Sequence, residues 1–219
     1  MQILFADNHI IVAEKPSGIS TEGEEGSLED LVKAWAKEHY EKKGAVFLKA
    51  VHRLDKPASG IVVFAKTSKA LARLHTAFRE RLISKKYRAL LEGILPKDEG
   101  VFEDFLLREE YRSSASNETS GKKASLSYKV LARHKDTTLV EVDLHTGRYH
   151  QIRVQFSLRG HPIVGDHKYG AKTALQGKKI ALHHQRIEFS HPISQEKCVF
   201  TSEPKEELLQ FVPHLKQLP

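Results

Sequence analysis

Residues 52–60 read HRLDKPASG, and the apolar run IVVFA follows at 61–65. The proline, serine and glycine after Asp55 predict a tight turn that leads into a buried strand. An acid at the start of such a turn is held rigidly, as a nucleophile or a general base must be. The alternative is an aspartate that only initiates the turn and pairs with Arg53 or Lys56.

The segments on either side of this motif predict mostly short strands joined by short turns. The predicted strands are 3–5, 9–13, 45–48, 61–66, 85–92, 101–107, 125–132, 138–144, 179–189 and 197–201. The predicted helices are 28–42, 68–82, 151–158 and 205–211. Strands that dominate and follow one another closely are typical of an α+β fold. We therefore expect a mainly antiparallel, mixed sheet with a few flanking helices, and no linker divides residues 1–219 into separate domains.

Local signals predict where several of these elements begin. Asp7 and Asn8 predict a hairpin turn between the first two strands. Ser27 is expected to cap the first helix, with Asp30 as its partner three residues later. Ser68 is expected to cap the second helix. Residues 109–123 are polar and have no apolar period, which predicts a long loop or a flexible hairpin.

Composition and charge limit the class of protein. The net charge of +7 favours a polyanionic partner, nucleic acid first. The single cysteine, Cys198, excludes an internal disulfide and fits a reducing compartment. No apolar stretch approaches the ~18 residues that span a membrane, and the first residues do not resemble a secretory signal. We expect a cytoplasmic protein, and a monomer.

Two other clusters could carry chemistry. The first, KKYRA at 85–89, places Tyr87 on a strand between basic residues, although a tyrosine there can equally be a packing residue. The second, TGRYHQIRV at 146–154, joins a turn to a segment rich in arginine, histidine and glutamine, and GHPIVGD follows at 160–166.

Several common kinds of active site lack their motifs here. Eight histidines lie between His134 and His191, but none forms the HExxH or His-x-x-x-His spacing of a metal site. The chain has no GxxxxGK[ST] loop and no GxGxxG, so nucleotide-cofactor chemistry has no support. Ser59 lacks the GxSxG elbow of a serine hydrolase.

Taken together, the clusters resemble the RluA-type family of RNA pseudouridine synthases. The opening strands with KPSG at 15–18, the HRLD motif at 52–55, the Lys86–Tyr87 pair and the two motifs between 146 and 166 occur in the family's order. The resemblance covers about residues 3 to 201. It implies a two-lobed catalytic domain with a central cleft, without an additional RNA-binding domain of the S4 type.

The resemblance implies isomerisation of uridine in RNA: the N1–C1′ bond breaks, the uracil turns, and C5 joins C1′. Asp55 would be the catalytic carboxylate. Arg153 would pair with Asp55 and keep it ionised and oriented. Tyr87 would lie against the uracil and help to remove the C5 proton.

The resemblance also assigns substrate contacts. Arg53 would fill the space that the flipped uridine leaves, because chemistry at C1′ and C5 needs an unstacked base. Leu182 would form part of the apolar wall of the pocket, with Ile180 and Ala181. The remaining expected RNA-binding residues are His52, Arg148, His150 and Gln151. The substrate would be rRNA or tRNA, and no metal or organic cofactor is implied.

The chain departs from the family pattern at two positions. Ala58 stands where the family commonly has threonine, which removes a hydroxyl from the turn but no catalytic group. Tyr149 stands where serine, threonine or lysine is usual, so local RNA contacts are expected to differ. Two other functions stay open: a non-catalytic RNA-binding module on the same scaffold, and a metal-dependent hydrolase or nuclease that uses the C-terminal histidines.

Overall fold

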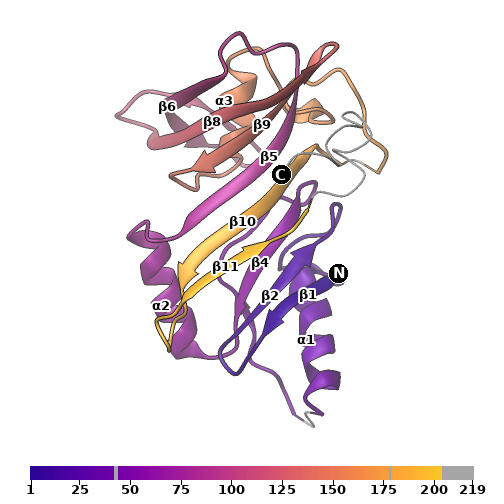
Figure 1. The fold of residues 1–219 in the computed structure, drawn as a ribbon, viewed down its shortest axis with the longest axis vertical. Coiled ribbons are helices and arrows are strands. Elements are labelled where there is room, and N and C mark those ends of the chain that lie inside the picture. The colour runs from indigo at the N-terminus through magenta and orange to yellow at the C-terminus, as the bar shows by residue number, and fades with distance from the viewer. Residues whose placement is uncertain (42–43, 178, 204–219) are drawn as a thin grey trace. The chain divides into compact units, whose positions relative to one another are not determined.

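The computed structural model describes residues 1–41, 44–177 and 179–203, which form two compact units. Unit 1 contains Met1–Ser84 and Arg186–Glu203, and unit 2 contains Lys85–Gln185. Among the described residues there are eleven strands and three α-helices (Figure 1). The strand pairs of known register are antiparallel. The predicted α+β class with a mainly antiparallel sheet is therefore confirmed. The helix expected at 205–211 lies outside the described residues.

In unit 1, a hairpin of β1 (Gln2–Ala6) and β2 (Ile10–Lys15) pairs through β2 with β4 (Ser59–Ala65). The carboxylate of Asp7 accepts the backbone N–H groups of His9 and Ile10, both at 2.7 Å, and this contact fixes the predicted turn. Every residue of β2 is buried, because β2 lies between two other strands.

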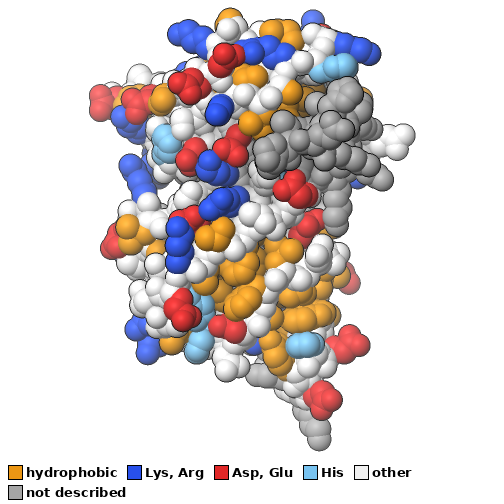
Figure 2. Space-filling view, in the orientation of Figure 1, with side chains coloured by type: hydrophobic (Ala, Val, Ile, Leu, Met, Phe, Trp, Pro, Cys, Tyr) orange, Lys and Arg blue, Asp and Glu red, His pale blue; other side chains and the backbone are white. Residues whose placement is uncertain are grey.

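Unit 1 contains further strand pairs. β11 (Lys197–Thr201) pairs with the C-terminal half of β10 (Leu182–Ser190), and β3 (Lys49–Ala50) pairs with β4. The prediction of a strand at 45–48 is wrong, because only the two residues that follow, Lys49 and Ala50, pair with β4. Leu48 is nevertheless buried while Phe47 is half exposed, so the apolar run there reflects packing rather than pairing. Figure 2 shows apolar side chains gathered over β1, β2 and β11. Phe5 of β1 and Phe200 of β11 contact each other, with ring centroids 5.4 Å apart.

Two helices belong to unit 1. Helix α1 (Leu28–His39) begins at Ser27, whose hydroxyl accepts the N–H of Asp30 and donates to its carboxylate, as the capping pattern predicts. Helix α2 (Ser68–Arg79) is capped one residue earlier than expected. Thr67 has the extended backbone that a cap needs, and its hydroxyl accepts the N–H of Ala70 at 3.1 Å.

Unit 2 is built on strands in the order β5-β9-β8-β6-β7. Their bounds are β5 (Ser84–Glu92), β6 (Glu99–Arg108), β7 (Ser113–Ser116), β8 (Lys122–His134) and β9 (Thr137–Leu144). The segment 109–123 is thus partly a strand, because residues 113–116 pair with the end of β6.

Helix α3 (Gln151–Ser157) of unit 2 is buried along almost its whole length. Phe156 packs between Phe102 and Tyr128, with ring centroids 5.1 and 5.7 Å away. This packing fixes α3 and the turn that precedes it against the sheet. In the part of the chain that the structure describes, no helix has the length and apolar character to cross a membrane.

Candidate active site

In unit 1, Asp55 lies in a turn whose backbone is fixed on both sides. The N–H of Ala58 donates to the carbonyl of Asp55 at 3.0 Å, and this bond closes the turn ahead of β4. Before it, the buried hydroxyl of Thr21 bonds to both the N–H and the carbonyl of Leu54, at 3.1 Å each. The Asp55 side chain is half-buried. The predicted turn is therefore present.

Lys15 supplies the clamp on the other side of Asp55. Its ammonium is fully buried and donates to the carbonyls of Pro16, Ile19 and Lys56, at 3.0, 2.8 and 3.2 Å. Burial lowers the pKa of Lys15 to about 8, and the negative charge of Asp55 opposes that shift. A buried positive charge thus lies within electrostatic reach of Asp55.

The two basic residues that flank Asp55 lie on the surface against an acidic loop. The guanidinium of Arg53 is 3.5 Å from the carboxylate of Glu22, and the ammonium of Lys56 is 2.6 Å from that of Glu24. All four side chains are more than a third exposed. The acids of these two exposed ion pairs come from the loop that precedes α1.

His52 has a packing role in this unit. Its Nε2 accepts the N–H of Val63 at 3.2 Å, and its ring packs against Phe78 with centroids 5.2 Å apart. These contacts connect the motif to β4 and α2, so His52 holds the turn in place.

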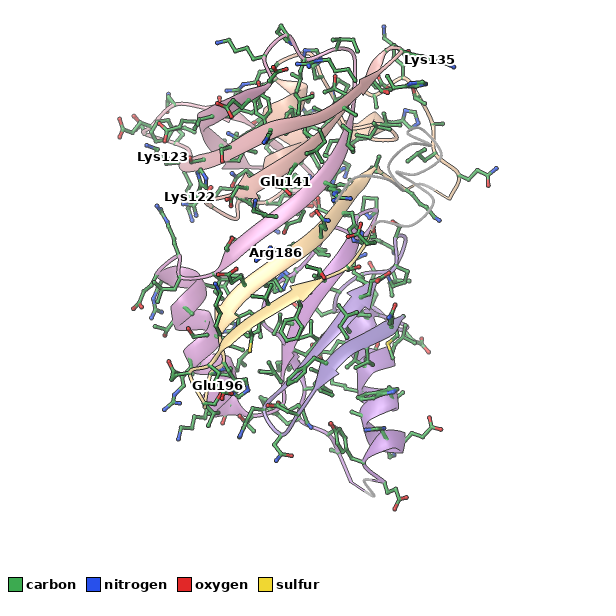
Figure 3. All side chains as sticks on the ribbon, viewed as in Figure 1. Lys122, Lys123, Lys135, Glu141, Arg186 and Glu196 are labelled. Carbon is green, nitrogen blue, oxygen red and sulfur yellow. The ribbon has the colours of Figure 1, made fainter. Side chains whose placement is uncertain are left out.

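In unit 2, Tyr87 lies on β5 and is buried, with 7% of its surface exposed. Its ring stacks on His184 of β10, with centroids 4.5 Å apart and planes 17° apart. The preceding residue, Lys86, forms an ion pair with Glu141 of β9 at 2.7 Å (Figure 3 labels Glu141). Stacking fixes the plane of the tyrosine ring, as a group that positions a flat base requires.

Arg153 lies on α3 and forms a buried ion pair that the sequence did not predict. Its Nε and Nη2 donate to both carboxylate oxygens of Asp166, at 2.7 and 2.8 Å. Only 5% of the arginine side chain and 1% of the aspartate side chain are exposed. The guanidinium also lies 5.1 Å from the ring of Tyr169. This two-bond geometry fixes the plane of the guanidinium.

The turn before α3 uses its polar side chains internally. Gln151 is buried; its carbonyl oxygen accepts the Thr146 hydroxyl and the N–H of Arg148, and its amide donates to Ser125. His150 is also buried, in a left-handed backbone conformation, and its Nδ1 contacts the Tyr169 hydroxyl at 2.9 Å. Arg148 is half-buried and donates from Nε to the carbonyl of Lys123. Of the three, Arg148 is the side chain that reaches the surface.

The predicted apolar wall is buried in unit 2: Ile180, Ala181 and Leu182 are 3, 0 and 5% exposed. The backbone N–H of Leu90 donates to the carbonyl of Ala181, which fixes the wall to β5.

No group of three or more His, Cys, Asp or Glu side chains in residues 1–41, 44–177 and 179–203 is arranged so that it could hold a metal ion.

The sequence motifs contained two further site residues without revealing their roles. Lys15 belongs to the KPSG motif and Asp166 to the GHPIVGD motif. In each motif, a charged residue lies beside a run of apolar residues. This pattern indicates a buried charge that has its own partner.

The chain is similar in sequence to known proteins. The family model described as RNA pseudouridylate synthase matches residues 9–158. The ribosomal large subunit pseudouridine synthase C of Vibrio vulnificus is 34% identical over 220 residues, which cover 98% of this chain and 69% of the relative. An uncharacterized RNA pseudouridine synthase of Bacillus subtilis, YhcT, is 34% identical over 207 residues, covering 91% of this chain and 67% of that protein.

The fold has a counterpart among solved structures. Human RNA pseudouridylate synthase domain containing 4 superposes with a TM-score of 0.84 at 23% identity, covering 100% of this chain and 94% of that chain. The fold is therefore shared, and the family match rests on the sequence. The chain belongs to the family of RNA pseudouridine synthases, the isomerases that convert uridine into pseudouridine within RNA.

Proposed function

We propose that Asp55 is the carboxylate that carries out the isomerisation. One observation supports this above all: the backbone on both sides of Asp55 is clamped, by Thr21 and by Lys15, and the buried ammonium of Lys15 lies in its electrostatic field. A surface aspartate that only ends a turn needs neither clamp. A rigid, ionised carboxylate is what bond breaking at C1′ requires.

The remaining roles follow from the same chemistry. Arg153 is a second catalytic residue, whose guanidinium is held by Asp166, and Tyr87 lies against the uracil and assists removal of the C5 proton. Leu182 lines the apolar pocket. Arg53 exchanges its exposed contact with Glu22 for the RNA and fills the space of the flipped uridine.

We propose rRNA as the substrate, because the most similar relatives include proteins named as synthases of the large ribosomal subunit. The protein would act as a monomer, through a single catalytic domain, in the cytoplasm. The net charge of +7 fits such a polyanionic substrate, and binding is expected to weaken as salt increases.

The test maps pseudouridine across total RNA from cells that have the gene, that lack it, and that carry Asp55→Ala. Sites that vanish in both altered strains support the proposal and identify the substrate. If no site changes while the purified protein still binds RNA, the chain is an RNA-binding module instead.

A further inference from the structure

Three flat groups form a column at one edge of unit 2. The ring of Tyr149 stacks on the ring of His150, with centroids 3.8 Å apart and planes 21° apart. The guanidinium carbon of Arg108 lies over the Tyr149 ring, 4.6 Å from its centroid. His150 is buried, Tyr149 is half-buried and Arg108 is exposed, so the column runs from the interior of the unit to its surface.

The inner end of this column is fixed by hydrogen bonds. The Tyr169 hydroxyl contacts His150 Nδ1 at 2.9 Å and accepts the N–H of Ser113 at 2.7 Å. The Ser113 hydroxyl in turn donates to the carbonyl of Tyr149 at 2.7 Å. Ser113 is also the residue opposite Arg108 in the β6–β7 ladder. The backbones that carry the column are therefore tied together, and the outer group is presented on a rigid support.

The ion pairs near Arg108 join other residues. Glu109 lies 3.9 Å from Arg112, and Glu103 lies 3.1 Å from Lys123. In the described part of the chain, by contrast, no carboxylate lies within ion-pair distance of Arg108, Arg148 or Lys168.

Hydrogen bonds tie the side chains of Arg148 and Lys168 to segments near β6 and β8. Arg148 donates to the carbonyl of Lys123, and Lys168 donates to the carbonyl of Tyr111, both at 2.9 Å. Figure 3 shows Lys122 and Lys123 projecting from the same end of β8. A surface of this composition attracts phosphates.

We propose that the outer face of the Arg108 guanidinium stacks on an unpaired base of the RNA, while Arg148 and Lys168 contact the adjoining phosphates. This proposal rests on RNA being the substrate. Arginine planes stack on splayed bases, and a lysine ammonium has no plane to offer. Tyr149 and His150 act as positioning residues, because both faces of the tyrosine ring are already covered.

The experiment compares Arg108→Lys and Arg108→Gln with the wild-type protein. The control is Lys135→Gln, which removes an exposed cation at the other end of β8 (Figure 3). The probes are a single-stranded RNA oligomer that contains 2-aminopurine, whose fluorescence falls on stacking, and inorganic polyphosphate, which has no bases. Unfolding midpoints of all four proteins establish that each is folded.

We expect Arg108→Lys to weaken RNA binding about tenfold and to abolish the stacking-dependent quench, because one base stack contributes a factor of this size. Polyphosphate binding by Arg108→Lys should match that of the wild type, and Lys135→Gln should show the wild-type quench. The proposal is overturned if Arg108→Lys binds and quenches like the wild type, or if Arg108→Gln weakens RNA and polyphosphate by the same factor.

Pseudouridine formation is measured separately, on rRNA from cells that lack the gene. A wild-type protein that quenches the probe but forms no pseudouridine contradicts the proposed function and leaves the stacking intact. A protein that forms pseudouridine while Arg108→Lys quenches normally contradicts the stacking alone.

Discussion

The Lys15 ammonium donates to the backbone carbonyl of Lys56, the residue directly after Asp55, at 3.2 Å. Forty-one residues separate the two partners, so this contact joins the end of β2 to the turn that holds the acid. Gly18 donates to the same carbonyl at 2.8 Å. The KPSG and HRLD motifs are thus parts of one structural unit, in which the first positions the second.

Lys15 gives the stability of the protein a characteristic pH dependence. Burial lowers its pKa from 10.5 to about 8. Between these values the unfolded chain binds more protons than the folded protein, so the free energy of unfolding rises with pH. Below pH 8 the buried charge costs the folded state about 3 kcal/mol, and this cost disappears as the pH approaches 10.5.

Urea unfolding of the wild type and of Lys15→Met across this window measures the effect. The unfolding free energy of the wild type minus that of Lys15→Met is expected to increase with pH. Lys37→Met, which changes an exposed lysine of α1, provides the control and should show no such trend. A constant difference for Lys15→Met would mean that Lys15 titrates normally.

Arg153→Ala is expected to destabilise the protein by about 3–5 kcal/mol, because it leaves Asp166 buried without its two charged bonds. The matched control is Arg186→Ala, which breaks the exposed pair with Glu188 and should cost about 1 kcal/mol or less. Denaturant midpoints measure both. Turnover of the folded fraction then tests the proposed catalytic role of Arg153: an unchanged rate would remove Arg153 from the active site.

Tyr87→Phe keeps the ring on His184 and removes only the hydroxyl. We expect turnover to fall by about 10²-fold or more if this hydroxyl assists proton removal, whereas RNA affinity should change little. Tyr128→Phe is the control, since this tyrosine of unit 2 is equally buried, at 7% exposed, and packs on Phe102. Equal rates for the two variants would assign Tyr87 to packing.

The acidic loop is expected to weaken RNA binding. In the free protein, Glu22 pairs with Arg53 and Glu24 pairs with Lys56. RNA must therefore displace both glutamates to reach these basic residues. Glu22→Gln combined with Glu24→Gln should tighten RNA binding about two- to fivefold at low salt, and less at high salt. Glu188 of β10 forms two surface ion pairs, with Arg186 and with Lys197. Glu188→Gln removes this acid and serves as the charge control. Filter binding measures the RNA affinity of each variant. The same gain in affinity for the control would show that the effect comes from net charge alone.

The sequence predicted the elements with strong local signals and missed the contacts that depend on tertiary structure. The Asp7 turn, the Ser27 cap and the turn after Asp55 follow from side chains that bond to their own neighbours. The strand expected at 45–48 failed because an apolar run records burial, whereas a strand needs a partner.

The candidate site shows the same division. The motifs led to the proposal of Asp55, Tyr87 and Arg153 as catalytic residues, but they did not predict the contacts that hold these residues in the structure. The bond between Arg153 and Asp166 spans 13 residues and that between Lys15 and Lys56 spans 41, so neither has a local pattern. His150 and Gln151 look like substrate contacts in sequence, yet their side chains are buried in hydrogen bonds within unit 2.

The most direct test of the central claim uses the proton that the reaction must release, because C5 of uracil exchanges its hydrogen for a bond to C1′. Purified wild type and Asp55→Asn are incubated with rRNA that carries tritium at C5 of uridine, and tritium in the solvent is measured. We predict release by the wild type, and none by a folded Asp55→Asn protein that still binds the RNA. Release at the wild-type rate by Asp55→Asn would contradict the assignment of Asp55 as the catalytic carboxylate.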